Sequence, residues 1–338
     1  MSGERSPITV IGAGSWGTAL ALQFARNDRP VRLWGRDASQ MKQMSVQRSN
    51  HRYLPDIRFP DHLVIDSELN SSLSGAKDVL VSVPSHGLRE TLEKIEPLLE
   101  TGARICWATK GFELRSGKLP HQVATDVLGE SRPMAVLSGP TFAKEVGEGL
   151  PTAMTIAAND PKFASELAIH LSGDNFRAYT SDDMIGVEVG GAVKNVLAIG
   201  AGISDGLSFG ANTRIALINR GLVEMTRLGV ALRARNDTFM GLAGMGDLVL
   251  TCTDNQSRNR RMGILLATGK TVEEAQEEIQ QVVEGVLAAK AVREVATSHH
   301  VVMPICQEIY RILYEGVSPR EAVGTLMSRT LKPEQVRI

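Results

Sequence analysis

The feature that most constrains this chain is a glycine-rich turn near its N-terminus. A β-branched run at 8–11 predicts a strand, and Gly12, Gly14 and Gly17 follow it with the spacing G-x-G-x-x-G, ahead of an apolar pattern of helical period. Gly12 would allow the tight turn, Gly14 would let the backbone approach a pyrophosphate, and Gly17 would let helix and strand pack closely. The N-terminus of the helix then offers free N–H groups to phosphates. This context favours a dinucleotide site over an ordinary glycine-rich turn.

The composition is that of a globular protein without a strong charge bias. The 338 residues are enough for two domains that each bury a core. The formal net charge is −1, whereas a dedicated nucleic-acid-binding protein usually carries a basic excess. We therefore expect a small-molecule partner rather than a nucleic acid.

The cysteines and the apolar runs indicate the compartment. Cys106, Cys252 and Cys306 are odd in number and lack the spacing of metal ligands, so they are typical of core residues in a reducing compartment. The polar residues 1–7 do not match a signal peptide, and no uninterrupted apolar run approaches the length of a membrane span. These features predict a cytoplasmic protein with no bound metal and no stable membrane insertion.

The end of the predicted second strand bears on the choice of cofactor. The run 31–34 predicts this strand, and Arg36 and Asp37 follow it about 20 residues after the glycines. An acid here accepts from the 2′-hydroxyl of NADH, whereas an arginine accommodates the 2′-phosphate of NADPH. Because Arg36 comes first, NADPH is favoured and NADH stays possible; both charges could also be ordinary solvated loop residues.

Further apolar runs at 78–83, 104–108 and 134–137 predict strands of a buried parallel sheet. The segments after two of them, 109–111 and 138–143, would reach the edge of the sheet where ligands bind. Strands that alternate with helical patterns predict an α/β domain of Rossmann type, with a mostly parallel, doubly wound sheet, over residues 1–180.

The pattern then changes, and residues 181–338 predict an all-α domain. Ser181 is a good N-cap for a long helix that runs past Lys194. Capping-box patterns begin at Thr271 and Ser318, and Gly269 is placed to end the preceding helix.

Lys194 lies in the most informative stretch of this second half. On a helix, Gly190 and Gly191 occupy the turn over which the Lys194 side chain leans, and mid-helix glycines cost about 1 kcal/mol each. One interpretation is that the glycines clear room for a small ligand beside the lysine. The alternative is close helix packing at the glycines, with the lysine extending to solvent.

Two further stretches carry groups suited to chemistry. The glycine-rich segment 241–246 ends at Asp247, with Thr251 one helical turn later; Asp247 could also be a simple N-cap. The segment 253–261 opens a helix with hydroxyl, amide and guanidinium groups, which is how a helix N-terminus binds a phosphate, although a solvated basic helix start has the same composition.

Taken together, these motifs resemble the bacterial NAD(P)-dependent sn-glycerol-3-phosphate dehydrogenases. The resemblance runs nearly end to end, and the motifs occur in the family's order. They are G-A-G-S-W-G at 12–17, Trp34-Gly35-Arg36, Tyr53-Leu54-Pro55, Thr109-Lys110-Gly111, Ser138-Gly139-Pro140-Thr141, Gly191-Ala192-Val193-Lys194-Asn195, Gly244-Met245-Gly246-Asp247 and Ser257-Arg258-Asn259.

The resemblance implies hydride transfer between the nicotinamide and C2 of dihydroxyacetone phosphate, giving sn-glycerol 3-phosphate, the backbone of glycerophospholipids. Lys194 would exchange the proton of the C2 oxygen, with Asp247 and Thr251 orienting it. A lysine suits this only if its pKa is lowered, which a second cation can do, and Lys110 is the candidate. Ser257, Arg258 and Asn259 would hold the substrate phosphate, and Gly139 and Thr141 would line the same pocket. Lys110 would touch both the substrate and the cofactor. Lys194 and Asp247 would also touch the substrate.

The resemblance also implies the cofactor contacts and a homodimer. Besides the three glycines, the implied cofactor residues are Ser15, Trp16, Arg36, Tyr53, Lys110, Ala143, Arg258, Val282 and Glu284. Two other interpretations stay open. A hydroxyacid or ketopantoate-type reductase shares this plan, but the cluster at 257–259 favours a phosphorylated substrate. A nucleotide-sensing module without turnover would not need the acid/base residues.

Overall fold

The computed structural model describes residues 7–331, 333 and 334, and its contacts divide the chain into two compact units. The first comprises Met1–Lys110 and Pro120–Met184, and the second Gly111–Leu119 and Ile185–Ile338. The division therefore falls slightly after the expected residue 180. The segment Gly111–Leu119, expected in the first domain, belongs to the second because Phe112 and Leu119 are buried in its core.

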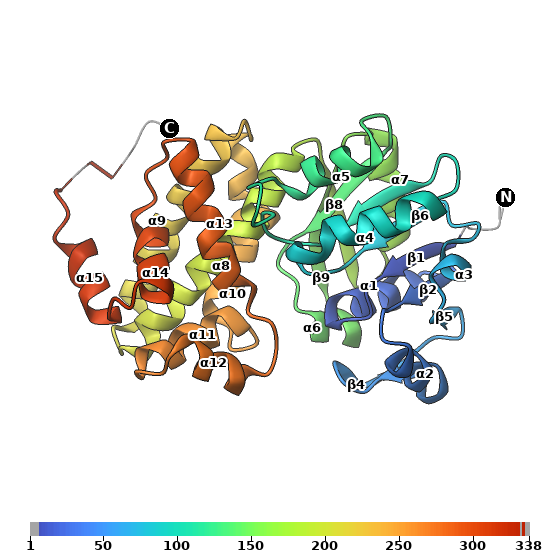
Figure 1. The fold of residues 1–338 in the computed structure, drawn as a ribbon, viewed down its shortest axis with the longest axis horizontal. Helices are drawn as coiled ribbons and strands as arrows, with labels where there is room; N and C mark the ends of the chain where they lie inside the picture. Colours follow the sequence, from blue (N-terminus) through green and yellow to red (C-terminus); the bar gives the residue numbers. More distant parts are fainter. Residues whose placement is uncertain (1–6, 332, 335–338) are drawn as a thin grey trace. The chain divides into compact units, whose positions relative to one another are not determined.

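Every strand of the described residues lies in the first unit (Figure 1). Eight strands form one sheet in the order β10-β9-β8-β7-β6-β1-β2-β5, and β3 and β4 form a separate antiparallel pair. All neighbours in the large sheet are parallel except β8 and β9, so the mostly parallel, doubly wound sheet is confirmed. The strands are β1 (Ile8–Ile11), β2 (Val31–Trp34), β3 (Ser49–Asn50), β4 (Leu54–Arg58), β5 (Leu63–Asp66), β6 (Asp78–Val81), β7 (Arg104–Trp107), β8 (Met134–Ser138), β9 (Thr152–Ala158) and β10 (Phe176–Ser181).

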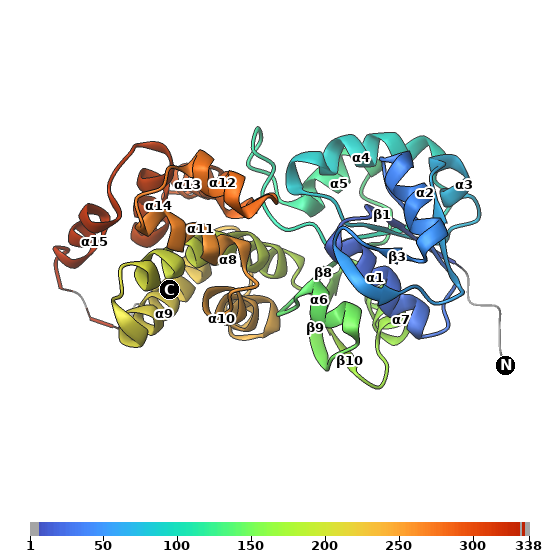
Figure 2. The same cartoon turned by 90° about the horizontal axis from the view of Figure 1, so that it is seen from below.

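Helices cover both faces of this sheet, with α4 and α5 on one face and α1 and α7 on the other (Figure 2). The sheet strands are buried on both sides where they are central, which is why β1, β6 and β8 are continuous apolar runs. The helices of this unit are α1 (Ser15–Arg26), α2 (Ala38–Gln47), α3 (Leu69–Leu73), η1 (Ser85–Gly87), α4 (Leu88–Ile95), η2 (Glu96–Leu98), α5 (Pro120–Leu128), α6 (Ala143–Glu148) and α7 (Pro161–Leu171).

Register brings the carboxyl ends of the central strands to one edge. Ile11 at the end of β1 is level with Trp34 of β2 and Val81 of β6, and Val81 is level with Trp107 of β7. The segments that leave these strands therefore start side by side, at the edge where ligands bind in such sheets.

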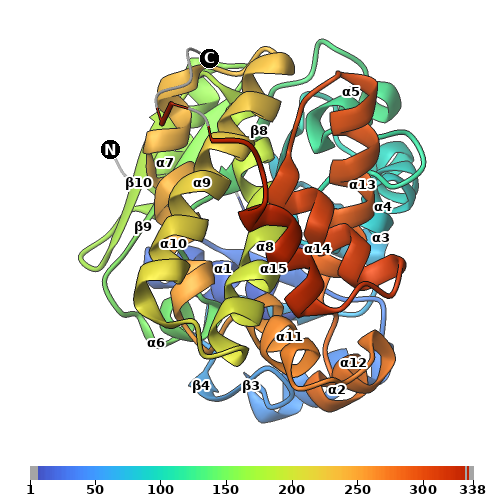
Figure 3. The same cartoon turned by 90° about the vertical axis from the view of Figure 1, so that its left-hand side faces the viewer.

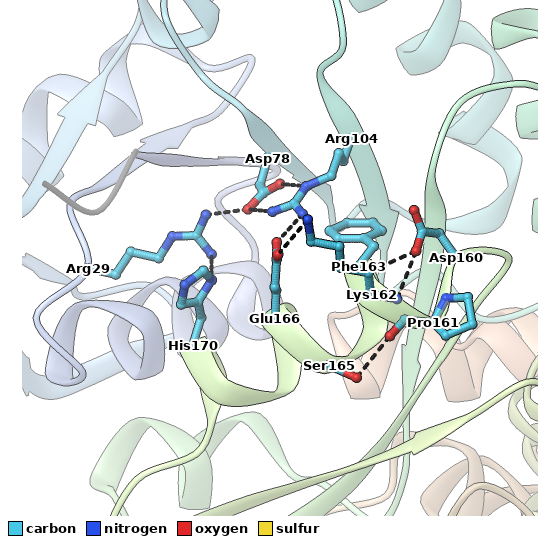
Figure 4. A network of polar contacts seen from close by, with 10 residues as sticks. All are labelled: Arg29, Asp78, Arg104, Asp160, Pro161, Lys162, Phe163, Ser165, Glu166 and His170. Atoms are coloured by element: carbon cyan, nitrogen blue, oxygen red, sulfur yellow. Dashed lines mark hydrogen bonds and ion pairs between the residues drawn. The ribbon is translucent and has the colours of Figure 1, made fainter. Parts of the chain in front are cut away.

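The opposite edge of the sheet is held by an ionic network around the buried Asp78 (Figure 4). Arg29 and Arg104 both donate to the carboxylate of Asp78, with the Arg104 Nε 2.6 Å from Oδ1. Glu166 pairs with Arg104, and His170 Nδ1 accepts from Arg29 at 2.9 Å, so this network fastens α7 to the sheet. Burial alone would raise the pKa of Asp78, but the hydrogen bonds and charges of the two arginines outweigh it, and the pKa lies below its ordinary value.

The second unit is helical and is built around α8, which is buried over most of its length. The helices α9 and α14 contact each other, and Figure 3 shows both of them beside α8. Its helices are α8 (Met184–Gly206), α9 (Gly210–Ala231), η3 (Asn236–Met240), the π-helical η4 (Leu242–Gly246), α10 (Asp247–Thr253), α11 (Arg258–Ala267), α12 (Val272–Ile279), α13 (Glu284–Ser298), α14 (Pro304–Tyr314) and α15 (Pro319–Met327).

The helix α8 is the only described helix long and apolar enough to cross a membrane. The sequence predicts a long helix here but no uninterrupted apolar run of that length, because Glu188 and Lys194 lie within it. In this structure 89% of its most apolar window is buried inside the unit. It is therefore the core helix of this unit.

The predicted helix ends are partly confirmed. Thr271 forms a full capping box with Glu274, Ser318 caps α15, and Gly269 follows the C-cap of α11 with φ +92°. Ser181 was wrong as an N-cap. It ends β10, its hydroxyl accepts from the Asp183 N–H, and α8 starts only at Met184.

Candidate active site

In the glycine-rich turn of the first unit, the three glycines lie in different environments. Gly12 has φ +117°, and a Cβ there would lie 2.4 Å from the Ser82 carbonyl oxygen. A Cβ on Gly17 would lie 1.9 Å from the Gly12 carbonyl oxygen, so this position requires glycine for packing. Gly14, the N-cap of α1, has open space where its side chain would be. The turn thus leaves room for a ligand at Gly14 alone.

Asn50, a residue outside the predicted site, holds this turn in place. The Asn50 amide donates to the Ala13 carbonyl at 3.2 Å and to Thr18 Oγ1 at 2.8 Å. Asn50 comes from the short strand β3, where no sequence pattern marks it.

Ser15 and Trp16 begin α1, and the buried Nε1 of Trp16 lacks a hydrogen-bond partner among the described residues.

The two charges after β2 have different environments. Asp37 is the N-cap of α2, and its Oδ1 accepts from the Gln40 N–H at 3.0 Å. Arg36 is exposed beside it. The carboxylate therefore already has a structural role, whereas the exposed Arg36 lies near enough to Glu90 for their charges to interact.

Three predicted substrate residues of the first unit meet at one carbonyl. The Lys110 ammonium and the Thr141 hydroxyl both donate to the Gly139 oxygen, at 3.4 and 3.2 Å. Gly139 has φ +152°, and a Cβ there would lie 2.9 Å from the Met154 Cα. Ala143 begins α6 just beyond, and Tyr53 packs partly buried against the core of this unit.

In the second unit, Lys194, Asp247 and Thr251 form one buried cluster. The Lys194 Nζ donates to Asp247 Oδ1 at 2.6 Å and to Thr251 Oγ1 at 3.0 Å. Thr251 Oγ1 also donates to the Asp247 carbonyl at 2.6 Å. Asp247 is the first helical residue of α10 and not its N-cap, which is Gly246. Its carboxylate instead faces a cation from another helix.

The interpretation that Gly190 clears space for a ligand was wrong. A Cβ at Gly190 would lie 2.3 Å from the Ala243 carbonyl oxygen and 3.5 Å from the Gly244 Cα. The room beside this glycine is filled by the backbone of η4, which leads directly into Asp247. Gly190 thus lets the segment that carries Asp247 approach α8. The lysine does not extend to solvent either, as the alternative required, because it is buried.

The start of α11 presents the predicted phosphate residues. Ser257 is the N-cap, and its hydroxyl oxygen accepts from the Arg260 N–H at 3.2 Å. Among residues 7–331, 333 and 334, the guanidinium of Arg258 has no ion-pair partner. The Asn259 side chain is committed internally, because Nδ2 donates to Asn195 Oδ1 at 2.9 Å and Oδ1 accepts from the Gly285 N–H at 2.8 Å.

Asn195 belongs to the sequence motif around Lys194, but no role was predicted for it. Its position directly after Lys194 is the signal that could have indicated one. It connects α8 to α11 through Asn259. Besides Arg258, two predicted cofactor residues of this unit lie close to each other at the start of α13: Val282 is half exposed in the preceding loop, and Glu284 is the first helical residue. Among the described residues, no three His, Cys, Asp or Glu side chains are grouped to hold a metal ion.

Two family models match the chain. The one described as "NAD-dependent glycerol-3-phosphate dehydrogenase N-terminus" matches residues 7–164, and the corresponding C-terminus model matches residues 183–324. The chain belongs to this family. It is an NAD(P)-dependent oxidoreductase, which excludes a binding module without turnover and the ketopantoate-type reductases.

Individual relatives agree with the family models over nearly the whole chain. The chain is 53% identical to "Glycerol-3-phosphate dehydrogenase [NAD(P)+]" of Bartonella quintana, covering 97% of this chain and 96% of that protein. It is 54% identical to the protein of the same description from Klebsiella pneumoniae, covering 99% of each. A crystal structure of glycerol-3-phosphate dehydrogenase from Coxiella burnetii matches with a TM-score of 0.94 at 46% identity, covering 97% of this chain and all of that one.

Proposed function

We propose that this glycerol-3-phosphate dehydrogenase interconverts dihydroxyacetone phosphate and sn-glycerol 3-phosphate, with Lys194 as the proton-exchanging residue. The observation that carries this proposal is the buried contact of Lys194 with the Asp247 carboxylate and the Thr251 hydroxyl. Lysines are seldom buried without a partner, and this one has a carboxylate and a hydroxyl that fix its direction. Such fixed geometry is what general acid catalysis requires.

The residues of the first unit fit a dinucleotide. Open space at Gly14 and the N-terminus of α1 suit a pyrophosphate, and the unpartnered Trp16 Nε1 is a donor in the same turn. Tyr53 and Ala143 of this unit, together with Val282 and Glu284 of the other, complete our proposed cofactor set. The nicotinamide, when bound, supplies or accepts the hydride at C2 of the substrate.

We propose NADPH as the preferred cofactor. Arg36 is exposed after β2, where it can pair with a 2′-phosphate. Asp37, the residue that would accept from the 2′-hydroxyl of NADH, already accepts from the Gln40 N–H. A carboxylate used as an N-cap has less capacity to hold a ribose, so the arginine decides the preference.

In this mechanism Lys194 gives its proton to the C2 oxygen during reduction and takes it back during oxidation. Asp247 holds the ammonium in position and compensates its charge while it is buried. Thr251 accepts a second N–H of the ammonium, so a carboxylate and a hydroxyl together fix the direction of the lysine side chain. In the first unit, Lys110 is a second cation proposed to touch both ligands.

The substrate phosphate is assigned to the start of α11. Arg258 supplies the planar fork, and the first backbone N–H groups of the helix supply further donors. Because the Ser257 oxygen accepts from Arg260, its hydroxyl hydrogen stays available to a phosphate oxygen. Asn259 contributes its backbone N–H, and its side-chain contacts fix the helix. Gly139 and Thr141 of the first unit are proposed to contact the substrate as well.

The deciding experiment is a dihydroxyacetone-phosphate-dependent NADPH oxidation assay, repeated with NADH and with dihydroxyacetone. Oxidation that requires the phosphorylated ketone and is faster with NADPH supports the proposal. Equal rates with dihydroxyacetone would contradict the phosphate assignment. We further propose a cytoplasmic homodimer that supplies glycerophospholipid synthesis, and light scattering during gel filtration tests the dimer by giving twice the chain mass.

A further inference from the structure

We propose that Asp205 and Arg260 are positioning residues that fix the phosphate-binding start of α11. This inference rests on the proposed function, since it explains how the site around Arg258 is held in place. It concerns two residues that do not touch the substrate in the proposed mechanism. All of the contacts involved lie within the second unit.

Arg260 is the third residue of α11, and residues two positions apart on a helix, such as Arg258 and Arg260, do not face each other. Its Nη2 donates to Asp205 Oδ2 at 2.6 Å, and its Nη1 donates to the side-chain oxygen of Asn255. Asn255 lies in the loop just before the Ser257 N-cap. One guanidinium therefore ties the loop before α11 to the last turn of α8.

The ion pair between Arg260 and Asp205 is largely shielded from water. The side chains of Arg260 and Asp205 are only 10% and 13% exposed, so their ion pair is screened much less than a surface pair. Arg214 donates to the other oxygen of Asp205 at 2.7 Å, but its side chain is more exposed, at 28%. Asp205 is thus paired on both oxygens, and its bond to Arg260 has a fixed direction.

The backbones of the two helices meet at the same place. A Cβ at Gly202 would lie 2.0 Å from the Arg260 carbonyl oxygen, and one at Gly263 would lie 2.0 Å from the Ile199 carbonyl oxygen. The start of α11 is also tied to α8 by the bond between Asn259 and Asn195. The helix α8 thus orients both Lys194 and the start of α11.

The surroundings of Arg258 and Arg260 support different roles for these two arginines. The guanidinium of Arg260 is held in its ion pair with Asp205 and in its hydrogen bond to Asn255. Arg258 lacks such a partner among the described residues and keeps its full charge for a doubly charged phosphate monoester. Removing the Asp205 carboxylate would release Arg260 and the loop at Asn255, and the donors of the phosphate site would lose their alignment.

The test compares Asp205→Asn and Asn255→Ala with the matched control Arg214→Gln, which removes an ion pair from the same carboxylate without touching α11. We expect both test variants to raise the KM for dihydroxyacetone phosphate about five- to tenfold, the effect of weakening one charge-assisted contact. The kcat and the KM for NADPH should change less than this, because Lys194 and the proposed cofactor residues of the first unit are untouched. Arg214→Gln should leave all three constants unchanged.

A merely structural ion pair would instead lower the melting temperature with no change in the KM for dihydroxyacetone phosphate, and that result would overturn the inference. Asn255→Ala changes an exposed loop residue and keeps the test open if Asp205→Asn does not fold. Arg258→Ala, measured in parallel, separates the two proposals. If Arg258→Ala alone raises this KM, the phosphate site stands and the positioning role fails. If Arg258→Ala leaves it unchanged, the phosphate site is elsewhere and both proposals fail.

Discussion

The Lys194 Nζ lies 2.6 Å from Oδ1 of Asp247, a residue 53 positions later in the chain. Both side chains are buried, and the contact joins α8 to α10. The two side chains form a buried ion pair, and the ammonium is the form that can donate a proton to the C2 oxygen during reduction. The contact depends on Gly190, since only a glycine allows the backbone of η4 to lie against α8.

The first prediction concerns this glycine. Gly190→Ala places a methyl group 2.3 Å from the Ala243 carbonyl oxygen, so η4 must shift and Asp247 with it. We expect a loss of about 1–3 kcal/mol in the free energy of unfolding, as for other overpacked sites, and a lower kcat. Thermal unfolding and steady-state kinetics measure both effects.

Gly324→Ala in α15 is the matched control, because a Cβ there meets nothing within 4 Å. It should be neutral or stabilise by up to about 1 kcal/mol. A Gly190→Ala enzyme with unchanged melting temperature but weakened substrate binding would restore the idea that this glycine makes room for a ligand.

The second prediction concerns cofactor choice. Arg36→Ala should raise the KM for NADPH by about tenfold or more and the KM for NADH much less. The reason is that only NADPH has a 2′-phosphate that loses its charged partner. Asp37→Ala is the comparison. It removes the N-cap of α2, should cost about 1 kcal/mol of stability, and should affect both cofactors alike. Equal losses with both cofactors in Arg36→Ala would contradict its assignment.

The third prediction concerns pH and Glu224. Burial raises the pKa of the Glu224 carboxyl to about 7. The carboxylate accepts from the Ile305 and Cys306 N–H groups at 2.7 and 3.1 Å, and these two hydrogen bonds lower the pKa but do not outweigh burial. A carboxyl with a higher pKa in the folded state binds its proton more tightly when folded. Its contribution to stability is therefore full below the ordinary pKa of 4.5 and is lost as pH rises through about 7.

Glu224→Gln removes this titration. The difference in unfolding free energy between the parent protein and this variant should be larger at about pH 5 than at about pH 8. Urea unfolding at both pH values measures it, with the exposed Glu277→Gln as a control whose difference stays constant. A difference that grows toward alkaline pH would show that Glu224 is stabilised in its ionised form.

Much of the first unit could be predicted from sequence because its signals are local. The strand, turn and helix at the glycines follow from the steric demands of Gly12 and Gly17, and apolar runs mark the buried parallel strands. Ser181 shows the limit of such signals. Its hydroxyl fits an N-cap, but pairing of β10 with β9 keeps this residue in the sheet.

The contacts of the candidate site were less predictable because they join distant segments. The residues Lys194, Asp247 and Thr251 could be named from their motifs, whereas the backbone of Ala243 against Gly190 could not, since helical spacing does not reveal what lies opposite a glycine. The same holds for Asn50, which holds the turn at Ala13 from a strand of two residues.

The most direct test of the proposed mechanism is the kcat of Lys194→Ala, measured with saturating dihydroxyacetone phosphate and NADPH. If Lys194 donates the proton, kcat should fall about 100- to 10,000-fold, the usual contribution of general acid catalysis, while NADPH still binds. Lys194→Arg should not restore it, because a guanidinium does not release its proton. A Lys194→Ala enzyme that folds and turns over at the parent rate would contradict the assignment of Lys194 as the proton donor.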